Sequence, residues 1–136
     1  MLTNSKLDSF VLLHQCDLGE AEGFIYENGI FLVRTKKNQQ LTIETVQRGN
    51  TFLASIDGGK YYNIYQFEAF SDVSPEVRVY AASREENKHT LADAIVISGF
   101  SQKILADFYL KFNKPVSPTK IFNKLDKAVD WLLSLM

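Results

Sequence analysis

Two residues near the N-terminus, His14 and Cys16, are of the types that nucleophilic catalysis uses. They lie two positions apart in Ser9–Cys16, a run predicted to be extended, so both side chains share one face of a strand. No third group at a recognisable spacing orients the histidine. A cysteine close to a histidine in the sequence is also a poor indicator of catalysis, because such local signatures differ from family to family. We therefore interpret the pair as structural, and His89, in a polar loop, as solvated.

Two further segments have the composition of ion-binding sites. Asp17, Glu20 and Glu22 form an acidic cluster, but they lack the ligand spacing of a calcium loop. Gly58-Gly59-Lys60 follows a predicted helix and precedes a predicted strand, the reverse of the order in phosphate loops. Cys16 is the only cysteine, which excludes cysteine clusters for zinc or iron–sulfur groups. We expect no metal site, no cofactor and no enzymatic activity.

The charge balance argues against nucleic acid as a partner. Fifteen Lys and Arg residues face sixteen Asp and Glu residues, for a net charge of −1. The aromatic run Tyr61–Phe70 therefore lacks the basic groove of a single-strand binder, and it is predicted to pack in the core. The lysines of the last third are interpreted as a solvated rim, with an anion or lipid head-group site as the alternative. They are Lys111, Lys114, Lys120, Lys124 and Lys127.

Length and hydropathy predict one domain, residues 1–136, in the cytoplasm. The 136 residues, 46% of them hydrophobic, suffice for one core, and no Pro/Gly-rich linker interrupts them. The N-terminus lacks the basic and apolar regions of a signal peptide. No apolar run approaches the roughly 20 residues that span a bilayer, so we expect no membrane insertion.

The N-terminal half predicts an antiparallel edge followed by a helix. Asn28-Gly29 favours a hairpin turn between the extended runs Phe24–Tyr26 and Ile30–Arg34. Thr42 is a helix N-cap, and Asp57-Gly58-Gly59 ends that helix. The next strand is predicted over Tyr61–Phe70.

The C-terminal half alternates helices with strands. Ser74-Pro75-Glu76 starts a helix predicted to run into Arg84–Asn87, and strands are predicted over Ala94–Ile97 and Lys120–Phe122. The helix between these strands is expected to place Ile104, Leu105, Phe108 and Phe112 on one side. Asn123 is expected to cap a last helix, whose core residues are Leu125, Ala128, Val129, Leu132 and Met136.

This alternation predicts an α/β fold with a mixed central sheet. The C-terminal strands are expected to pair in parallel through right-handed crossovers. They lie beside the antiparallel strands of the N-terminal edge. About four helices cover such a sheet.

Three segments resemble small STAS-like proteins of unknown function from bacteria, particularly the Bacteroidetes. They are Ala106–Pro115, Pro118–Phe122 and Ala128–Leu132. The order of elements from Thr42 onward resembles the wider STAS class, which includes anti-sigma-factor antagonists and the cytoplasmic domains of anion transporters. The resemblance implies a single STAS-like domain that acts as a non-enzymatic regulator.

In the antagonists, a strand ends in an Asp-Ser-Ser-Gly or Asp-Thr-Ser-Gly turn, where a kinase-like anti-sigma factor phosphorylates a serine. The matching junction here is Asp72-Val73-Ser74-Pro75, so the resemblance makes Ser74 the candidate phosphoacceptor and Ser71 a weaker one. Val73 replaces a hydroxyl residue, and Pro75 replaces the glycine and removes a backbone donor. An N-cap serine without a regulatory role is therefore the alternative reading of Ser74.

The resulting hypothesis is an interaction module that presents this junction to a protein partner, such as a kinase-like regulator. Its expected interaction surface comprises Asp72, Val73, Ser74, Pro75, Glu76 and Arg78. The alternative is a small-molecule or lipid carrier, with aromatic residues lining a space between sheet and helices. A homodimer is expected if an apolar patch is left to cover.

Overall fold

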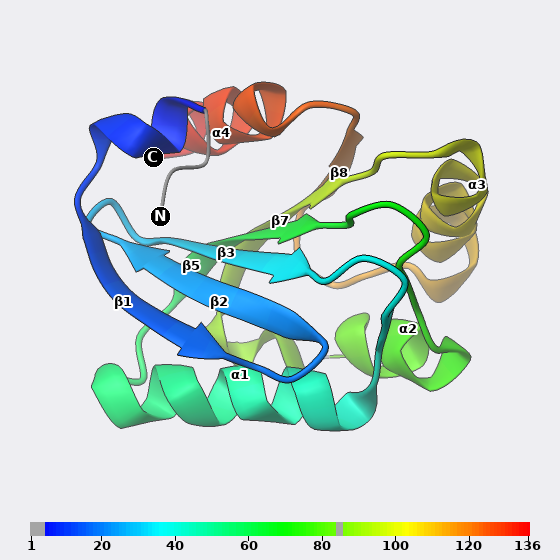
Figure 1. Cartoon of the computed structure of the whole chain (residues 1–136), viewed down its shortest axis with the longest axis horizontal. Helices are drawn as coiled ribbons and strands as arrows, with labels where there is room; N and C mark the ends of the chain where they lie inside the picture. Colours follow the sequence, from blue (N-terminus) through cyan, green and yellow to red (C-terminus); the bar gives the residue numbers. More distant parts are fainter. Residues whose placement is uncertain (1–4, 84–85) are drawn as a thin grey trace.

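The fold is built on a sheet with helices on both faces (Figure 1). Within residues 5–83 and 86–136, which the computed structural model describes, six strands lie in the order β1-β2-β3-β5-β7-β8, and β4 and β6 form a separate pair. The strands are β1 Leu12–Asp17, β2 Ala21–Tyr26, β3 Ile30–Thr35, β4 Gln40–Leu41, β5 Tyr61–Gln66, β6 Asp72–Val73, β7 Thr90–Val96 and β8 Thr119–Phe122. The α-helices are α1 Ile43–Ile56, α2 Pro75–Ala81, α3 Phe100–Phe108 and α4 Leu125–Ser134. Single turns are η1 Lys6–Ser9, η2 Glu86–His89 and the π-helical η3 Tyr109–Asn113.

The pairing of strands confirms the predicted mixed sheet. β1, β2 and β3 are antiparallel, whereas β3, β5, β7 and β8 are parallel neighbours. The predicted hairpin joins β2 to β3, where Gly29 adopts a φ of +84° and its N–H donates to the Tyr26 carbonyl at 3.1 Å. The parallel pairs are connected by α1, α2 and α3, because parallel strands need a crossover.

Each face of the sheet has its own apolar core. Figure 1 shows α4 and η1 on one side of the sheet, with α1 and α2 on the other. The α4 face buries the side chains Leu7, Phe24, Ile30, Leu32, Ile64, Ala94, Val129 and Leu132. The opposite face, called the α1 face below, buries Leu18, Ile25, Phe31, Val33, Leu53 and Tyr61, and farther along Ala82, Ile95, Ala106 and Tyr109.

Two helix starts predicted from capping residues are confirmed. The Thr42 hydroxyl accepts from the Thr45 N–H at 3.4 Å at the start of α1, and the Ser74 hydroxyl accepts from the Val77 N–H at 3.3 Å at the start of α2. Gly58, with a φ of +65°, follows the end of α1 as predicted.

Two predicted boundaries on either side of α2 are wrong. β5 ends at Gln66 rather than Phe70, because the chain turns away there: Phe70 has a φ of +59° and its side chain is 87% exposed. Helix α2 ends at Ala81 instead of running into Arg84–Asn87. Of that predicted end, Arg84 and Glu85 lie outside the described residues.

The last helix also differs from its prediction at both ends. The N-cap of α4 is Lys124, without a side-chain cap, rather than Asn123. Met136 lies beyond the end of the helix and is 51% exposed, so it is not a core residue. The other four predicted core residues of α4 are buried.

Among the described helices, none combines the length and the apolar character needed to cross a membrane.

A buried polar pair interrupts the apolar α1 face of the sheet. Asn63 of β5 and Asp93 of β7 are register partners, with 4% and 6% of their surfaces exposed. The Asn63 amide donates to Asp93 Oδ1 at 3.0 Å and to the Thr90 hydroxyl at 3.1 Å. Burial raises the pKa of Asp93 to about 7, and the Asn63 hydrogen bond opposes this rise only in part.

We expect the stability of the fold to decrease as the pH rises from about 4 to about 7. Because the folded-state pKa of Asp93 is raised, the native chain holds a proton that the unfolded chain has already released. One such proton lowers the free energy of unfolding by up to about 1.4 kcal/mol per pH unit between the two pKa values. Urea denaturation across this range measures the decrease. Asp93→Asn, which keeps an acceptor for Asn63, should remove most of it, and an unchanged slope would contradict this assignment.

Candidate functional site

The junction between β6 and α2 lies at the end of the sheet where β5 and β7 terminate. β6 pairs in parallel with β4, and the Ser74 N–H donates to the Leu41 carbonyl at 3.1 Å. Of the predicted interaction residues, Pro75 and Glu76 are exposed, and the others are half-buried. The others are Asp72, Val73, Ser74 and Arg78. The structure thus brings the six predicted residues together at one turn, and their role in partner binding stays a prediction.

The two candidate phosphoacceptors differ in access. Ser74 is half-buried, and its hydroxyl is engaged with the Val77 N–H. Ser71 is 1% exposed, and its hydroxyl lies 2.6 Å from the Thr35 hydroxyl and donates to the Glu68 carbonyl at 2.7 Å. A kinase would have to open this turn to reach Ser71, so Ser74 is the better placed of the two.

The loop between β5 and β6 is held by the side chain of Gln102 in α3. The Gln102 amide nitrogen donates to the carbonyls of Glu68 and Ser71 at 2.9 and 2.8 Å, and its oxygen accepts from the Ser98 N–H at 2.7 Å. Gln102 is only 7% exposed, so these bonds satisfy polar groups that water does not reach. The loop places Phe70 in solvent, with 87% of its surface exposed.

Helix α3 turns the apolar side that its spacing predicts toward solvent. Its buried residues are Gln102 and Ala106, followed by Tyr109 of η3. The exposed fractions are 54% for Ile104, 45% for Phe108 and 61% for Phe112, and Leu105 is half-buried. The inward side of α3 carries Ala106, which is small, and Gln102, whose amide donates to loop carbonyls. The apolar side chains therefore point outward.

These residues belong to a larger group of exposed apolar side chains, which we call the α2–α3 surface. Its members are Phe100, Ile104, Phe108 and Phe112, which follow one another at intervals of four residues along α3 and η3. The rings of Phe108 and Phe112 have centroids 4.7 Å apart, and the Arg78 guanidinium lies 5.7 Å from the Phe108 centroid. Side chains from α2 and from α3–η3 therefore adjoin. Helical periodicity identified the stripe on α3 but could not show which way it points.

Basic groups accompany this surface. The Lys111 ammonium lies 5.4 Å from the Phe112 ring centroid. Lys103 pairs with Asp107 one helical turn away at 2.7 Å, and no ion pair joins Arg78 or Lys111 to a described carboxylate. Among the lysines predicted to form a solvated rim, Lys120 places its ammonium group 5.8 Å from the centroid of the Phe122 ring.

A cavity of about 90 Å³, open on one side, lies between the α1 face of the sheet and helices α2 and α3. Its walls are mostly apolar, and include Val77 and Ala81 of α2 and Leu105 and Ala106 of α3. Three charged residues line it, namely Asp72, Arg78 and Asp93. The alternative hypothesis of a carrier expects a space between sheet and helices, and this cavity lies there. Its residue Asp93 was not singled out, because it precedes the apolar run from which its strand was predicted.

The structure places His14 and Cys16 in different surroundings. His14 is exposed, and its ring contacts Phe52 of α1 edge-on, with centroids 6.5 Å apart. Burial raises the pKa of the half-buried Cys16 thiol, which disfavours the reactive thiolate. His89 is half-buried rather than solvated, and its Nδ1 lies 3.2 Å from the Gly59 carbonyl oxygen.

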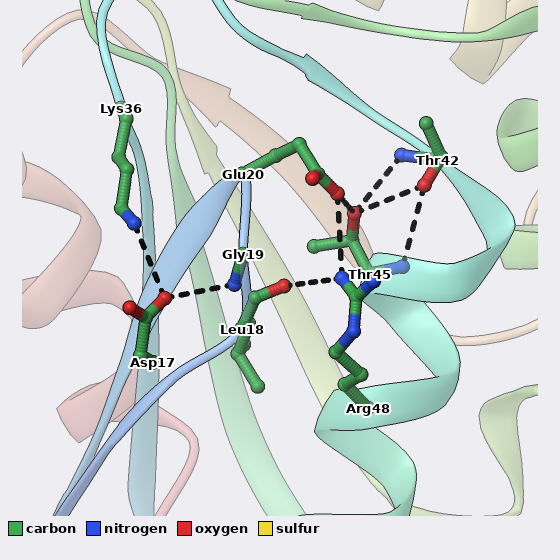
Figure 2. A network of polar contacts seen from close by, with 8 residues as sticks. All are labelled: Asp17, Leu18, Gly19, Glu20, Lys36, Thr42, Thr45 and Arg48. Carbon is green, nitrogen blue, oxygen red and sulfur yellow. Dashed lines mark hydrogen bonds and ion pairs between the residues drawn. The ribbon is translucent and has the colours of Figure 1, made fainter.

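Glu20 of the predicted acidic cluster connects the β1–β2 turn to α1, as Figure 2 shows. Glu20 accepts from the Thr45 hydroxyl, the main reason that its pKa is lowered, and lies 3.4 Å from Arg48. Asp17 accepts from the Gly19 N–H at 2.8 Å and from Lys36 at 3.1 Å.

Since Arg48 also donates to the Leu18 carbonyl at 2.7 Å, these carboxylates serve structural contacts. In the described part of the chain, no three His, Cys, Asp or Glu residues are grouped as metal ligands.

Comparisons with known proteins define the family and the fold. The chain is similar to a solved structure of an uncharacterised protein from Shewanella loihica PV-4, of the DUF3478 family, which has a SpoIIAA-like fold. The TM-score is 0.50 at 15% identity, over 90% of this chain and 91% of that chain, so the likeness confirms the STAS-like fold. No curated protein matches the sequence. Residues 24–136 match the model of a domain of unknown function, DUF7793, and the chain belongs to that family.

Proposed function

We propose that this chain is a non-enzymatic, cytoplasmic interaction module that binds a protein partner through the α2–α3 surface and the adjoining junction at Ser74. The observation that carries the proposal is the spacing of Phe100, Ile104, Phe108 and Phe112, which places large apolar side chains four residues apart on exposed positions. Contiguous exposed apolar side chains rimmed by polar groups mark interaction sites on soluble proteins. The single, half-buried cysteine is consistent with a reducing compartment.

The ring contacts favour a preorganised surface. Phe108 packs on Phe112, and Arg78 and Lys111 each lie over one of these rings. Side chains that already contact one another lose less rotamer freedom when a partner binds. Aromatic and arginine side chains are also the types that dominate binding energy at interfaces.

The charges indicate an acidic partner. Arg78 and Lys111 border the surface without a carboxylate partner among the described residues, and only Lys103 is paired. A partner helix with apolar residues on one side and acidic residues at its margins matches both features. A second copy of this chain is the competing occupant, which sedimentation of the purified protein distinguishes.

Substitution of the exposed apolar side chains tests this proposal. We expect the double variant Phe100→Ser and Ile104→Ser to weaken partner binding by about tenfold or more, because truncating interface anchors typically has effects of this size. Both side chains are exposed, so folding should be retained. The measurement is quantitative crosslinking through Lys103 and Lys111 in intact host cells, followed by mass spectrometry.

Leu13→Ser is the matched control, because Leu13 of β1 is also 54% exposed but lies outside the α2–α3 surface. It should leave the crosslinks unchanged. If the double variant keeps wild-type crosslinks, or if the recovered crosslinks join two copies of this chain, the proposed partner is wrong.

A separate prediction concerns control by phosphorylation at Ser74. A phosphate there adds negative charge at the border of a surface that we propose binds an acidic partner. Ser74→Asp should therefore weaken binding several-fold. Ser74→Ala should keep binding while lowering the free energy of unfolding by about 1 kcal/mol, because it removes the N-cap of α2. Titration of the crosslinked partner against each variant measures the first effect, and urea denaturation measures the second. Equal binding by both variants would exclude the switch but not the module.

A further inference from the structure

The cavity between the sheet and helices α2 and α3 holds a buried carboxylate without a counter-charge. Asp93 lies on its sheet side, and Asn63 donates to one of its two oxygens. Among residues 5–83 and 86–136, no cationic side chain lies within ion-pair distance of Asp93. A buried carboxylate is costly unless a hydrogen-bonding cation accompanies it. Its side chain also lines a space open to small molecules.

Two further residues in this part of the fold have a buried polar atom without a hydrogen-bond partner. These atoms are Oδ1 of Asn63 and Nε of Arg78. The Arg78 guanidinium is directed to the rim, since it lies over Phe108 and its Nη1 donates to the Val73 carbonyl at 3.4 Å. Of the three charged residues that line the cavity, Asp93 is the one that is buried.

We propose that this cavity binds a small apolar amine, whose ammonium group donates to the Asp93 carboxylate while its hydrocarbon part contacts Ile95, Leu105 and Ala106. The ammonium supplies the counter-charge that the fold does not provide. The three apolar residues line the same cavity as Asp93. This inference is independent of the proposed protein interaction, because the side chains that it needs lie inside the cavity rather than on the α2–α3 surface.

The size of the cavity limits the amine. A cavity of about 150 Å³ encloses benzene, so the 90 Å³ here corresponds to about four non-hydrogen atoms, with the open side accommodating one or two more. Isobutylamine is of this size. Isobutanol has nearly the same shape and also donates a hydrogen bond, but it carries no charge, which makes it the matched control compound.

The test is a titration of the full chain with isobutylamine and with isobutanol at about pH 8, followed through backbone amide NMR signals. We expect isobutylamine to shift the signals of Asp93, Ile95 and Ala106, with an affinity about tenfold or more above that of isobutanol, since charge-assisted bonds are the stronger ones. Equal affinities, or no shifts with either compound, would overturn the proposal.

Two variants make the result specific. Asp93→Asn retains the shape and the bond from Asn63, and should reduce the affinity for isobutylamine to that for isobutanol. Ala106→Leu fills the cavity and should abolish binding of both compounds, with folding checked by the dispersion of the amide signals. Retained amine binding in Asp93→Asn would contradict the assignment. So would tighter binding of Nα-acetyl-lysine amide than of isobutylamine, because the occupant would then be a lysine of a bound protein.

Discussion

The hydrogen bonds of Gln102 determine how the C-terminal end of the sheet is arranged. Carbonyl groups of a loop pressed against a helix need donors that water does not provide, and the Gln102 amide supplies them for Glu68 and Ser71. To do so, Gln102 must face inward, and Ala106, one turn later, lies on the same side. The rotation of α3 is thereby fixed. As a result its phenylalanine and isoleucine side chains point to solvent, while the small Ala106 leaves space for the cavity.

Local features of the fold were predictable from the sequence because they depend on short-range chemistry. The caps at Thr42 and Ser74, the turn at Gly29 and the buried stripe of α4 follow from hydrogen-bonding capacity, backbone freedom and periodicity. The orientation of α3 was not predictable, since a helix with an apolar stripe satisfies the same periodicity whichever way the stripe faces. Its direction depends on tertiary hydrogen bonds of one glutamine.

The candidate site was likewise predictable only in part. The junction at Ser74 was identified through the family resemblance, and the structure gathers its residues at one turn. The Asn63–Asp93 pair gave no local signal, because only the parallel register of β5 and β7 makes the two residues neighbours. Arg78 connects the two regions, since it lines the cavity and also lies over Phe108. An occupant of the cavity would therefore touch a residue that shapes the α2–α3 surface.

The central claim is that the α2–α3 surface is open in the free chain and covered by another protein in the cell. Covalent footprinting of aromatic and aliphatic side chains, performed on purified protein and in intact host cells, tests it most directly. We predict strong labelling of Phe100, Ile104 and Phe108 in the purified chain and protection of all three in cells, with Leu13 labelled equally in both. Equal labelling of the three residues in both settings would contradict it.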